Sequence, residues 1–221
     1  MIKHLKYLAI LTGVMLLMSA TVKEKKVKLF NGKDLKNWNK VVFEPVTSLD
    51  DVFQVEDGVI KVSGKPNGYI VTSDSYSDYK LHVEWRWTAE PGNSGVLLHV
   101  QEYNPDEWPL CIEAQLKHPN AGDIVLIGEG AGVSRDDSIY VIEPDERRYE
   151  SLVKFRDSNE KSPGEWNAYD ITCKGNNIDL VVNGLVQNIV SEASFSSGRI
   201  ALQSEGAPIE FRNIYLVSLG E

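Results

Sequence analysis

The sequence predicts an all-β protein, built as an antiparallel sandwich or a jelly roll, and three observations lead to that fold class. Short strand-like segments recur along most of the chain. Asn-Gly and Asp-Gly pairs, which supply the positive φ angles of tight turns, punctuate these segments. No long amphipathic helix is evident between them, as a parallel α/β fold would require.

The candidate strands share apolar and polar alternation or a high content of β-branched and aromatic residues. They are residues 79–87, 94–101, 110–116, 166–173, 177–182, 198–205 and 209–219. Tight turns are expected at Asn31-Gly32, Asp57-Gly58 and Asn183-Gly184, the last two between strand-like runs. The polar tract 134–164 is expected to be a long connection.

The first 20 residues have the composition of a secretory signal peptide. Lys3 and Lys6 precede an apolar run over residues 7–18, and Ser19-Ala20 provides small residues for cleavage. The run is short for a membrane span. We therefore expect a signal peptide at 1–20, a single domain over 21–221, and an exported protein that is periplasmic or extracellular, with no membrane anchor after cleavage.

The charge balance limits the possible partners. Removal of the signal peptide leaves 21 basic and 32 acidic side chains, a net charge of −11. An acidic surface repels phosphate backbones and anionic lipids, so nucleic acid and membrane partners are not expected. Neutral ligands such as carbohydrates remain open.

The two cysteines, Cys111 and Cys173, could form a disulfide in an exported protein. The strand alternation argues against it, because Cys111 shares a face with Glu113 whereas Cys173 shares an apolar face with Ile171. Disulfide geometry needs mutually directed Cβ atoms. Free thiols are the favoured interpretation.

Three consecutive candidate strands each carry polar side chains on one face and apolar side chains on the opposite face. The polar sets are His82, Glu84 and Arg86; His99 and Gln101; and Cys111, Glu113 and Gln115. Because sequential strands are often neighbours, we expect these rows to merge into one polar patch.

Two interpretations of this patch are open. A solvated outer face is the simpler one, and Glu84 with Arg86 is equally interpretable as a structural ion pair. The absence of lysine from the three sets just named and the presence of Trp108 nearby favour a carbohydrate site, where aromatic faces and carboxylate or amide groups meet hydroxyl pairs. His82, His99 and His118 lack metal-ligand spacing, so no zinc site is expected.

Seven segments resemble, in order, those of the 3-keto-disaccharide hydrolase domain family. They are "LFNGKDLKNW", "FQVEDGVIKV", "YKLHVEWRW", "PGNSGVLLHV", "CIEAQL", "GEWNAYDITCKGNNIDLVVNG" and "GRIALQSEGAPIEFRNIYLVSL". The resemblance covers nearly the whole chain after the signal peptide. It implies a concanavalin A-like jelly roll of two curved antiparallel sheets, with the site on the concave sheet. It also implies action on glycosides that are oxidised at C3 of the sugar.

A mechanism follows from that substrate class. A ketone at C3 acidifies the C2 proton, a base removes this proton, the leaving group departs from C1, and water can then add to the enone. We expect Glu113 or Glu84 to be the base, with Glu113 favoured because an ion-paired Glu84 would have too low a pKa. Arg86 or His99 would stabilise the enolate.

The remaining site expectations concern binding. Asn93 and Gln115 are expected to hydrogen-bond sugar hydroxyls, and Gln101, Trp108 and His118 are further candidates for substrate contact. No cofactor is indicated, no metal ligand is assigned, and the sequence leaves open whether a divalent metal is needed. The alternatives are a non-catalytic carbohydrate-binding module and a conventional glycoside hydrolase with Glu84 and Glu113 as its two carboxylates.

Overall fold

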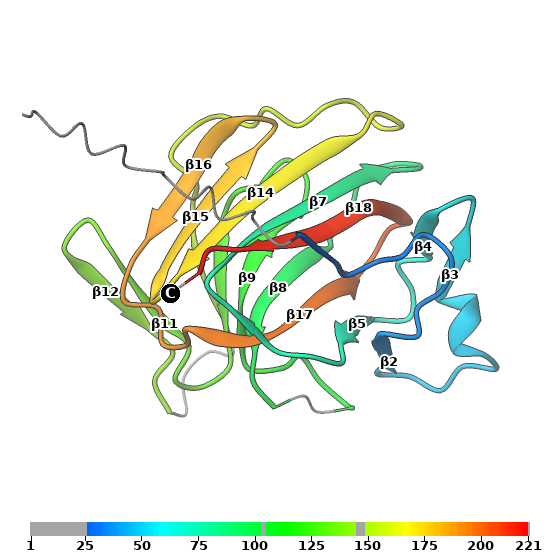
Figure 1. Ribbon diagram of the computed structural model, residues 1–221, viewed down its shortest axis with the longest axis horizontal. Helices are drawn as coiled ribbons and strands as arrows, with labels where there is room; N and C mark the ends of the chain where they lie inside the picture. The colour runs from blue at the N-terminus through cyan, green and yellow to red at the C-terminus, as the bar shows by residue number, and fades with distance from the viewer. Residues whose placement is uncertain (1–25, 103–104, 145–148, 221) are drawn as a thin grey trace, which may run out of the picture.

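The computed structural model describes residues 26–102, 105–144 and 149–220, and it consists almost entirely of antiparallel strands (Figure 1). The one helical element in these ranges is a short 3-10 turn, η1 (Leu49–Asp51), which Ser48 caps. The predicted all-β jelly roll of two antiparallel sheets is therefore confirmed. The predicted signal peptide at 1–20 lies outside the described residues.

One of the two large sheets, here called the β7 sheet, contains most of the long strands. Its order is β16 (Leu185–Val190), β15 (Asn177–Val182), β14 (Asn167–Lys174), β7 (Tyr79–Trp87), β18 (Ile209–Ser218), β4 (Val59–Val62) and β3 (Phe53–Glu56), and β1 (Lys26–Lys28) also pairs with β18.

The second large sheet, here called the β8 sheet, packs against the first. Its order is β13 (Tyr149–Leu152), β10 (Ile124–Ile127), β9 (Cys111–Gln115), β8 (Gly95–Val100), β17 (Ser197–Ser204), β5 (Gly68–Thr72) and β2 (Trp38–Val42), and β6 (Tyr76–Ser77) also pairs with β17. Figure 1 shows β8 and β9 behind β7 and β18.

The expected long connection over 134–164 contains more regular structure than its polar composition indicated. A hairpin of β11 (Gly132–Arg135) and β12 (Ser138–Val141) forms a separate two-stranded sheet, and β13 joins the edge of the β8 sheet. Half of the positions in β12 and β13 are exposed, and apolar residues such as Ile139 and Tyr149 are among them, so these strands lack the alternation by which the other strands were recognised.

Two of the three expected tight turns are hairpin turns in the structure. Asp57-Gly58 joins β3 to β4 and Asn183-Gly184 joins β15 to β16, with positive φ at all four residues. Asn31-Gly32 does not close a hairpin. The Asn31 side chain instead accepts hydrogen bonds from the backbone N–H groups of Lys33 and Asp34 in a local turn.

The main core lies between the two sheets. Alternate side chains of β7, such as Trp85, face inward and meet Tyr169 of β14 at a ring separation of 5.1 Å. Leu98 of β8 and Ile112 of β9 face the same core from the β8 sheet and are fully buried. Cys173 belongs to this core and Cys111 to the opposite face of the β8 sheet, and both are free thiols, as expected.

The outer face of the β8 sheet carries a second apolar cluster. Its members come from six strands: Val41, Tyr69, Val71, Leu97, Val100, Cys111, Val125, Ile127 and Ala201. Phe43 and Trp108 pack against them. A sheet face of this kind is usually polar when it meets water, so an apolar, buried outer face indicates a surface shaped for something other than solvation. In the described residues no helix is long and apolar enough to cross a membrane.

Candidate functional site

Glu113 lies in the middle of the apolar outer face of the β8 sheet. In the strand register it stands between Leu97 of β8 and Val125 of β10, and only 3% of its surface is exposed. A carboxyl group is rarely buried among apolar side chains, because the ionised form loses its hydration. Glu113 is therefore the first candidate for a functional group on this face.

Gly95 makes the space that the Glu113 carboxyl group occupies. A Cβ atom at position 95 would lie 2.0 Å from Oε1 of Glu113 and 2.6 Å from Oε1 of Gln203. Residue 95 therefore has no room for a side chain. The side chains of Glu113 and Gln203 converge in the space left by the missing Cβ, and this part of the sheet face, with the adjoining Asn93 and Glu205, is here called the hollow.

The hollow contains acceptor oxygens that lack donors. Oε1 of Glu113, Oε1 of Gln203 and Oδ1 of the neighbouring Asn93 are buried and have no hydrogen-bond partner among the described residues. An unsatisfied buried acceptor destabilises a fold by about 1–3 kcal/mol. Acceptors in one hollow are suited to a ligand with several hydroxyl donors, and a sugar is such a ligand.

Glu205 is a second carboxyl group at this hollow. It follows β17 directly, and the backbone of Asn93 forms an isolated β-bridge with it. Burial raises the pKa of Glu205, while a hydrogen bond from the Asn93 side chain and the charge of Lys117 act in the opposite direction. Burial raises the pKa of Glu113 well above its usual value, and the negative charge of Glu205 raises it further.

The segment 92–95 is fixed between two strands, and this arrangement holds the hollow in shape. The Ser94 hydroxyl donates to the backbone oxygen of Gln203 at 2.9 Å, and the Leu116 N–H donates to the backbone oxygen of Ser94. The backbone oxygen of Gly92 accepts from the N–H of His118 at 3.0 Å. The residues of the hollow are thus positioned by backbone hydrogen bonds rather than by a free loop.

Three aromatic side chains lie on the same face of the sheet. Tyr69 of β5 is opposite Gln203 of β17 in the register. The ring of Trp108 lies 6.3 Å from that of Tyr69 and 4.8 Å from that of Phe43, which it meets edge to face. Trp108 and Phe43 are only partly buried. Such aromatic surfaces suit the C–H faces of sugars or an aromatic group attached to a sugar.

The expected single polar patch does not form, because β7 lies in the other sheet. Glu84 and Arg86 project from the outer face of the β7 sheet, so they cannot meet Glu113. Glu84 does not pair with Arg86 either: Arg212 donates to Glu84 at 2.6 Å, and Arg86 donates to Glu210 at 2.6 Å. The geometry thus separates the two carboxylates that the conventional-glycosidase alternative required.

His99 also lies away from the hollow, because a β-bulge shifts the alternation of β8. Its φ angle is +50°, and the pairing of β17 with β8 changes register at this point. Val100 consequently joins the outer cluster, and the fully buried His99 ring lies 5.8 Å from the ring of Tyr79 of the core. Burial lowers the pKa of His99. The expected alternation was wrong from this residue onward.

The other expected binding residues make structural contacts. The Gln101 amide donates to the backbone oxygens of His99 and Ser197, and the Gln115 side-chain oxygen accepts from the N–H groups of Leu116 and Lys117. His118 lies near the segment 92–95 and contacts Glu160, with Nδ1 3.0 Å from the carboxylate. Asn93 and Trp108 are the two that lie at the hollow or beside it.

The sequence reasoning missed Gln203, Glu205, Tyr69 and Phe43. Gln203 and Glu205 alternate along "ALQSEG" in the same way as Glu113 and Gln115 along "CIEAQL", so the signal was present. This alternation was not connected with the site, because residues 198–205 lie far along the chain from β8. The jelly-roll topology places β17 directly beside β8.

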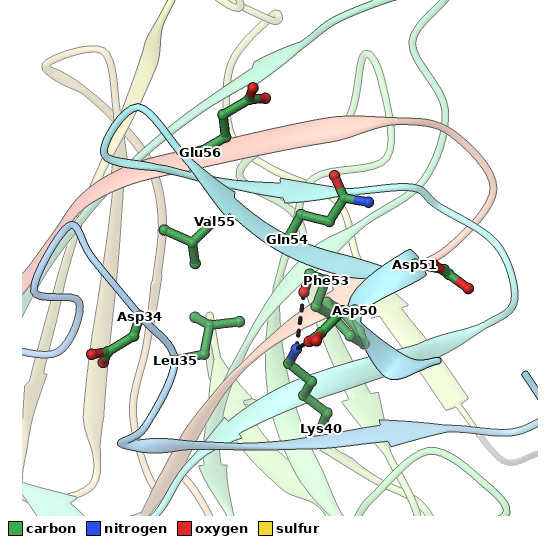
Figure 2. A pocket seen from close by; sticks show the side chains of 9 residues that line it. All are labelled: Asp34, Leu35, Lys40, Asp50, Asp51, Phe53, Gln54, Val55 and Glu56. Carbon is green, nitrogen blue, oxygen red and sulfur yellow. Dashed lines mark hydrogen bonds and ion pairs between the residues drawn. The ribbon is translucent and has the colours of Figure 1, made fainter. Parts of the chain in front are cut away.

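A separate groove of about 610 Å³ lies at β2, η1 and β3, away from Glu113 (Figure 2). Its lining is rich in exposed acidic side chains, and none of the expected site residues contributes to it. Figure 2 shows Lys40 directed at Asp50 and at the Phe53 carbonyl oxygen, with which it forms hydrogen bonds. We find no arrangement in this groove that favours catalysis. Across the described ranges, no three His, Cys, Asp or Glu side chains are grouped to hold a metal ion.

Residues 25–217 match the family described as the 3-keto-alpha-glucoside-1,2-lyase-like domain. The chain belongs to this family. The resemblance inferred from the seven segments is thereby confirmed. No curated protein sequence matches the chain.

Similar solved structures support the fold. A candidate glycosyl hydrolase from Parabacteroides distasonis ATCC 8503 superposes with a TM-score of 0.63 at 24% identity, covering 88% of this chain and 94% of that one. A Bacillus licheniformis beta-glucanase has a TM-score of 0.56 at 9% identity, with coverages of 90% and 99%. The carbohydrate-binding module CBM66 from Bacillus subtilis has a TM-score of 0.52 at 11% identity, with coverages of 82% and 96%.

Proposed function

We propose that this protein is an exported enzyme that cleaves 3-keto-glycosides, including 3-keto-disaccharides, by removal of the C2 proton and elimination at C1. Family membership supports the substrate class. The observation that carries the proposal is the Glu113 carboxyl group, which is buried in an apolar face beside acceptors that have no donors. A structural surface would gain nothing from that arrangement, whereas proton transfer to and from a sugar requires it.

The chemistry needs proton transfer and substrate orientation. The C3 ketone allows the C2 proton to leave as the enolate forms, and the C1–O bond then breaks to give an enone, which water can hydrate. A carboxyl group whose pKa is raised by burial, as that of Glu113 is, is suited to such transfers. Asn93 and Gln203 are placed to accept hydrogen bonds from sugar hydroxyls, and the aromatic surface at Trp108 is placed to contact the leaving group.

The geometry favours catalysis over the binding-module alternative. A binding surface needs aromatic platforms and few buried ionisable groups. Here two carboxyl groups with raised pKa values flank the hollow, and each is less stable as an ion than it would be in water. Evolution of a mere sugar-binding face would not require this destabilising pair.

The decisive experiment compares a 3-keto-disaccharide with its unoxidised parent. We expect the purified protein to release the leaving sugar from the oxidised substrate only. Release from both would indicate a conventional glycosidase, and binding of either without release would indicate a binding module. The Glu113→Gln variant should lose release of the sugar by at least about 100-fold while retaining binding. Wild-type activity in that variant would refute the role of Glu113.

A further inference from the structure

Glu113 and Gln203 present acceptor oxygens to one another with nothing between them to donate. Both Oε1 atoms lie within 2.6 Å of the point where a residue-95 Cβ would be, and neither has a partner among the described residues. Two facing acceptors repel each other if Glu113 is ionised. A proton on Glu113 removes the conflict, because the carboxylic acid can donate to the Gln203 oxygen.

Burial raises the pKa of Glu205 as well, but the polar neighbours of Glu205 act in the opposite direction, which those of Glu113 do not. The Asn93 side chain donates to the Glu205 carboxylate, and the exposed Lys117 ammonium acts on it from the end of β9. Both contacts stabilise negative charge. Glu205 is also less buried than Glu113. The two carboxyl groups of one hollow thus differ in the charge state that their neighbours favour, and such a difference identifies an acid and a base.

We propose that Glu205 is the general base that removes the C2 proton and that Glu113 is the general acid that protonates the leaving oxygen. This assignment rests on the proposed function, and it reverses the role that the sequence favoured for Glu113. The polar end of the hollow, with Asn93 and Glu205, receives the keto sugar. The apolar floor around Glu113 and the aromatic surface receive the leaving group.

The proton and electron balance closes within the pair. The Glu205 carboxylate takes the proton from C2, and the electrons of that C–H bond form the C1=C2 double bond of the enone. The C1–O bond breaks with its electron pair on oxygen, and this oxygen takes the proton of Glu113. The pair ends with Glu113 ionised and Glu205 protonated, and one proton exchanged with solvent restores the starting state.

The groups that face Glu113 favour its protonated form in the absence of substrate. Val125 of β10 and Leu97 of β8 are apolar, and Cys111 on its own strand is a neutral thiol whose pKa is raised well above its usual value by burial. Gln203 of β17 offers an oxygen, and Glu205 offers negative charge. Among these neighbours none carries a positive charge that would favour the ionised form of Glu113.

Leaving groups of different basicity separate the two roles. Nitrophenolate departs without protonation, whereas a sugar alkoxide does not. With the 3-keto-disaccharide, both Glu113→Gln and Glu205→Gln should lose at least about 100-fold in kcat/KM. With 4-nitrophenyl 3-keto-glucoside, the kcat/KM of Glu205→Gln should again be at least about 100-fold below that of the wild type. The kcat/KM of Glu113→Gln should fall less than tenfold, and this variant should keep the isotope effect of a C2-deuterated substrate. Equal loss with both leaving groups in Glu113→Gln, or the converse pattern, would overturn the assignment.

A measurement without substrate tests the resting proton. The infrared carbonyl band of a protonated carboxylic acid should be present in the wild-type protein at pH 7, absent in Glu113→Gln, and kept in the control Glu210→Gln, whose carboxylate is ion-paired with Arg86 on the β7 sheet. An unchanged spectrum in Glu113→Gln would refute the protonated Glu113. If the wild-type protein cleaved neither keto-glycoside, the proposed function would fail, and the infrared result would still decide the location of the proton.

Discussion

Gly95 gives the sharpest test of the geometry of the hollow. Its φ angle is ordinary, so the Gly95→Ala substitution adds one methyl group without backbone strain. That methyl group would lie 2.0 Å from Oε1 of Glu113, whereas an ordinary contact is 3.4 Å or more. The carboxyl oxygen must therefore retreat by about 1.4 Å, or the strands must separate.

Two magnitudes follow from this displacement. Overpacking of a buried site costs about 1–3 kcal/mol, and removal of a glycine from a strand interior returns roughly 0.5–1 kcal/mol, so the middle of the two ranges gives a net loss of about 1 kcal/mol. For a chain of this size the melting temperature should fall by about 2–4 °C. A misplacement of about 1 Å in a catalytic group reduces turnover by around 100-fold.

The assay combines thermal unfolding with kcat/KM for the 3-keto-disaccharide. Gly132→Ala is the matched control, because its new Cβ would meet atoms no closer than 3.0 Å, in the β11–β12 hairpin, and its activity should be unchanged. In a Glu113→Ala background, Gly95→Ala should destabilise the protein less than in the wild type, since the clash with Glu113 is removed and only the 2.6 Å contact with Gln203 remains. Activity within threefold of wild type and a melting temperature within one degree for Gly95→Ala would refute the reasoning.

Three further predictions concern titration and the second sheet. The pKa of Glu113 is raised above its usual 4.5, so the contribution of its protonated form to the stability of the fold is complete below that pH and decreases as the pH rises toward the folded-state pKa. Glu113→Gln should therefore match the wild-type melting temperature near pH 4 and exceed it near pH 8. The pKa of His99 is lowered below 6.5, so the contribution of its neutral form to the stability of the fold is present above that pH and decreases as the pH falls. In His99→Asn, whose new side chain tolerates the positive φ, the melting temperature should fall less steeply from pH 7 to pH 5 than in the wild type. An unchanged slope would contradict the burial argument. Glu84→Gln weakens a partly exposed ion pair with Arg212 and should cost no more than about 1 kcal/mol in chemical denaturation, with kcat/KM within twofold of wild type; a larger loss of activity would place Glu84 in the reaction after all.

Strands with one buried face follow the alternation that the sequence reasoning uses, whereas β5 and β10, which are buried on both faces, were not among the predicted strands. β7 and β14 alternate between buried and exposed positions over their whole length, which is the pattern that the sequence reasoning uses. β5 and β10 are buried at every position, so they have no alternation to detect. Their recognition requires knowledge of what covers the outer face of the β8 sheet.

The candidate site was predictable only where one strand carried the signal. Glu113 could be singled out because a carboxylate in an apolar strand is unusual by itself. The grouping with Glu84 failed because successive strands β7 and β8 belong to different sheets, which is decided by tertiary packing. The predicted face of the His99 side chain was wrong because a bulge inserts one residue into the alternation, and nothing local in "GVLLHV" indicates that insertion.

Strand β17, which supplies Gln203 and leads into Glu205, is hydrogen-bonded to β8 on one edge and to β5 on the other. Amide deuteration there should be among the slowest in the molecule, since the strand cannot fray without disrupting the middle of its sheet. Gln203 and Glu205 would therefore be held rigidly before a substrate binds, and binding should change their positions little. Improved turnover in engineered variants should then come from substitutions around Phe43 and Trp108, with the central strands β8 and β17 left unchanged.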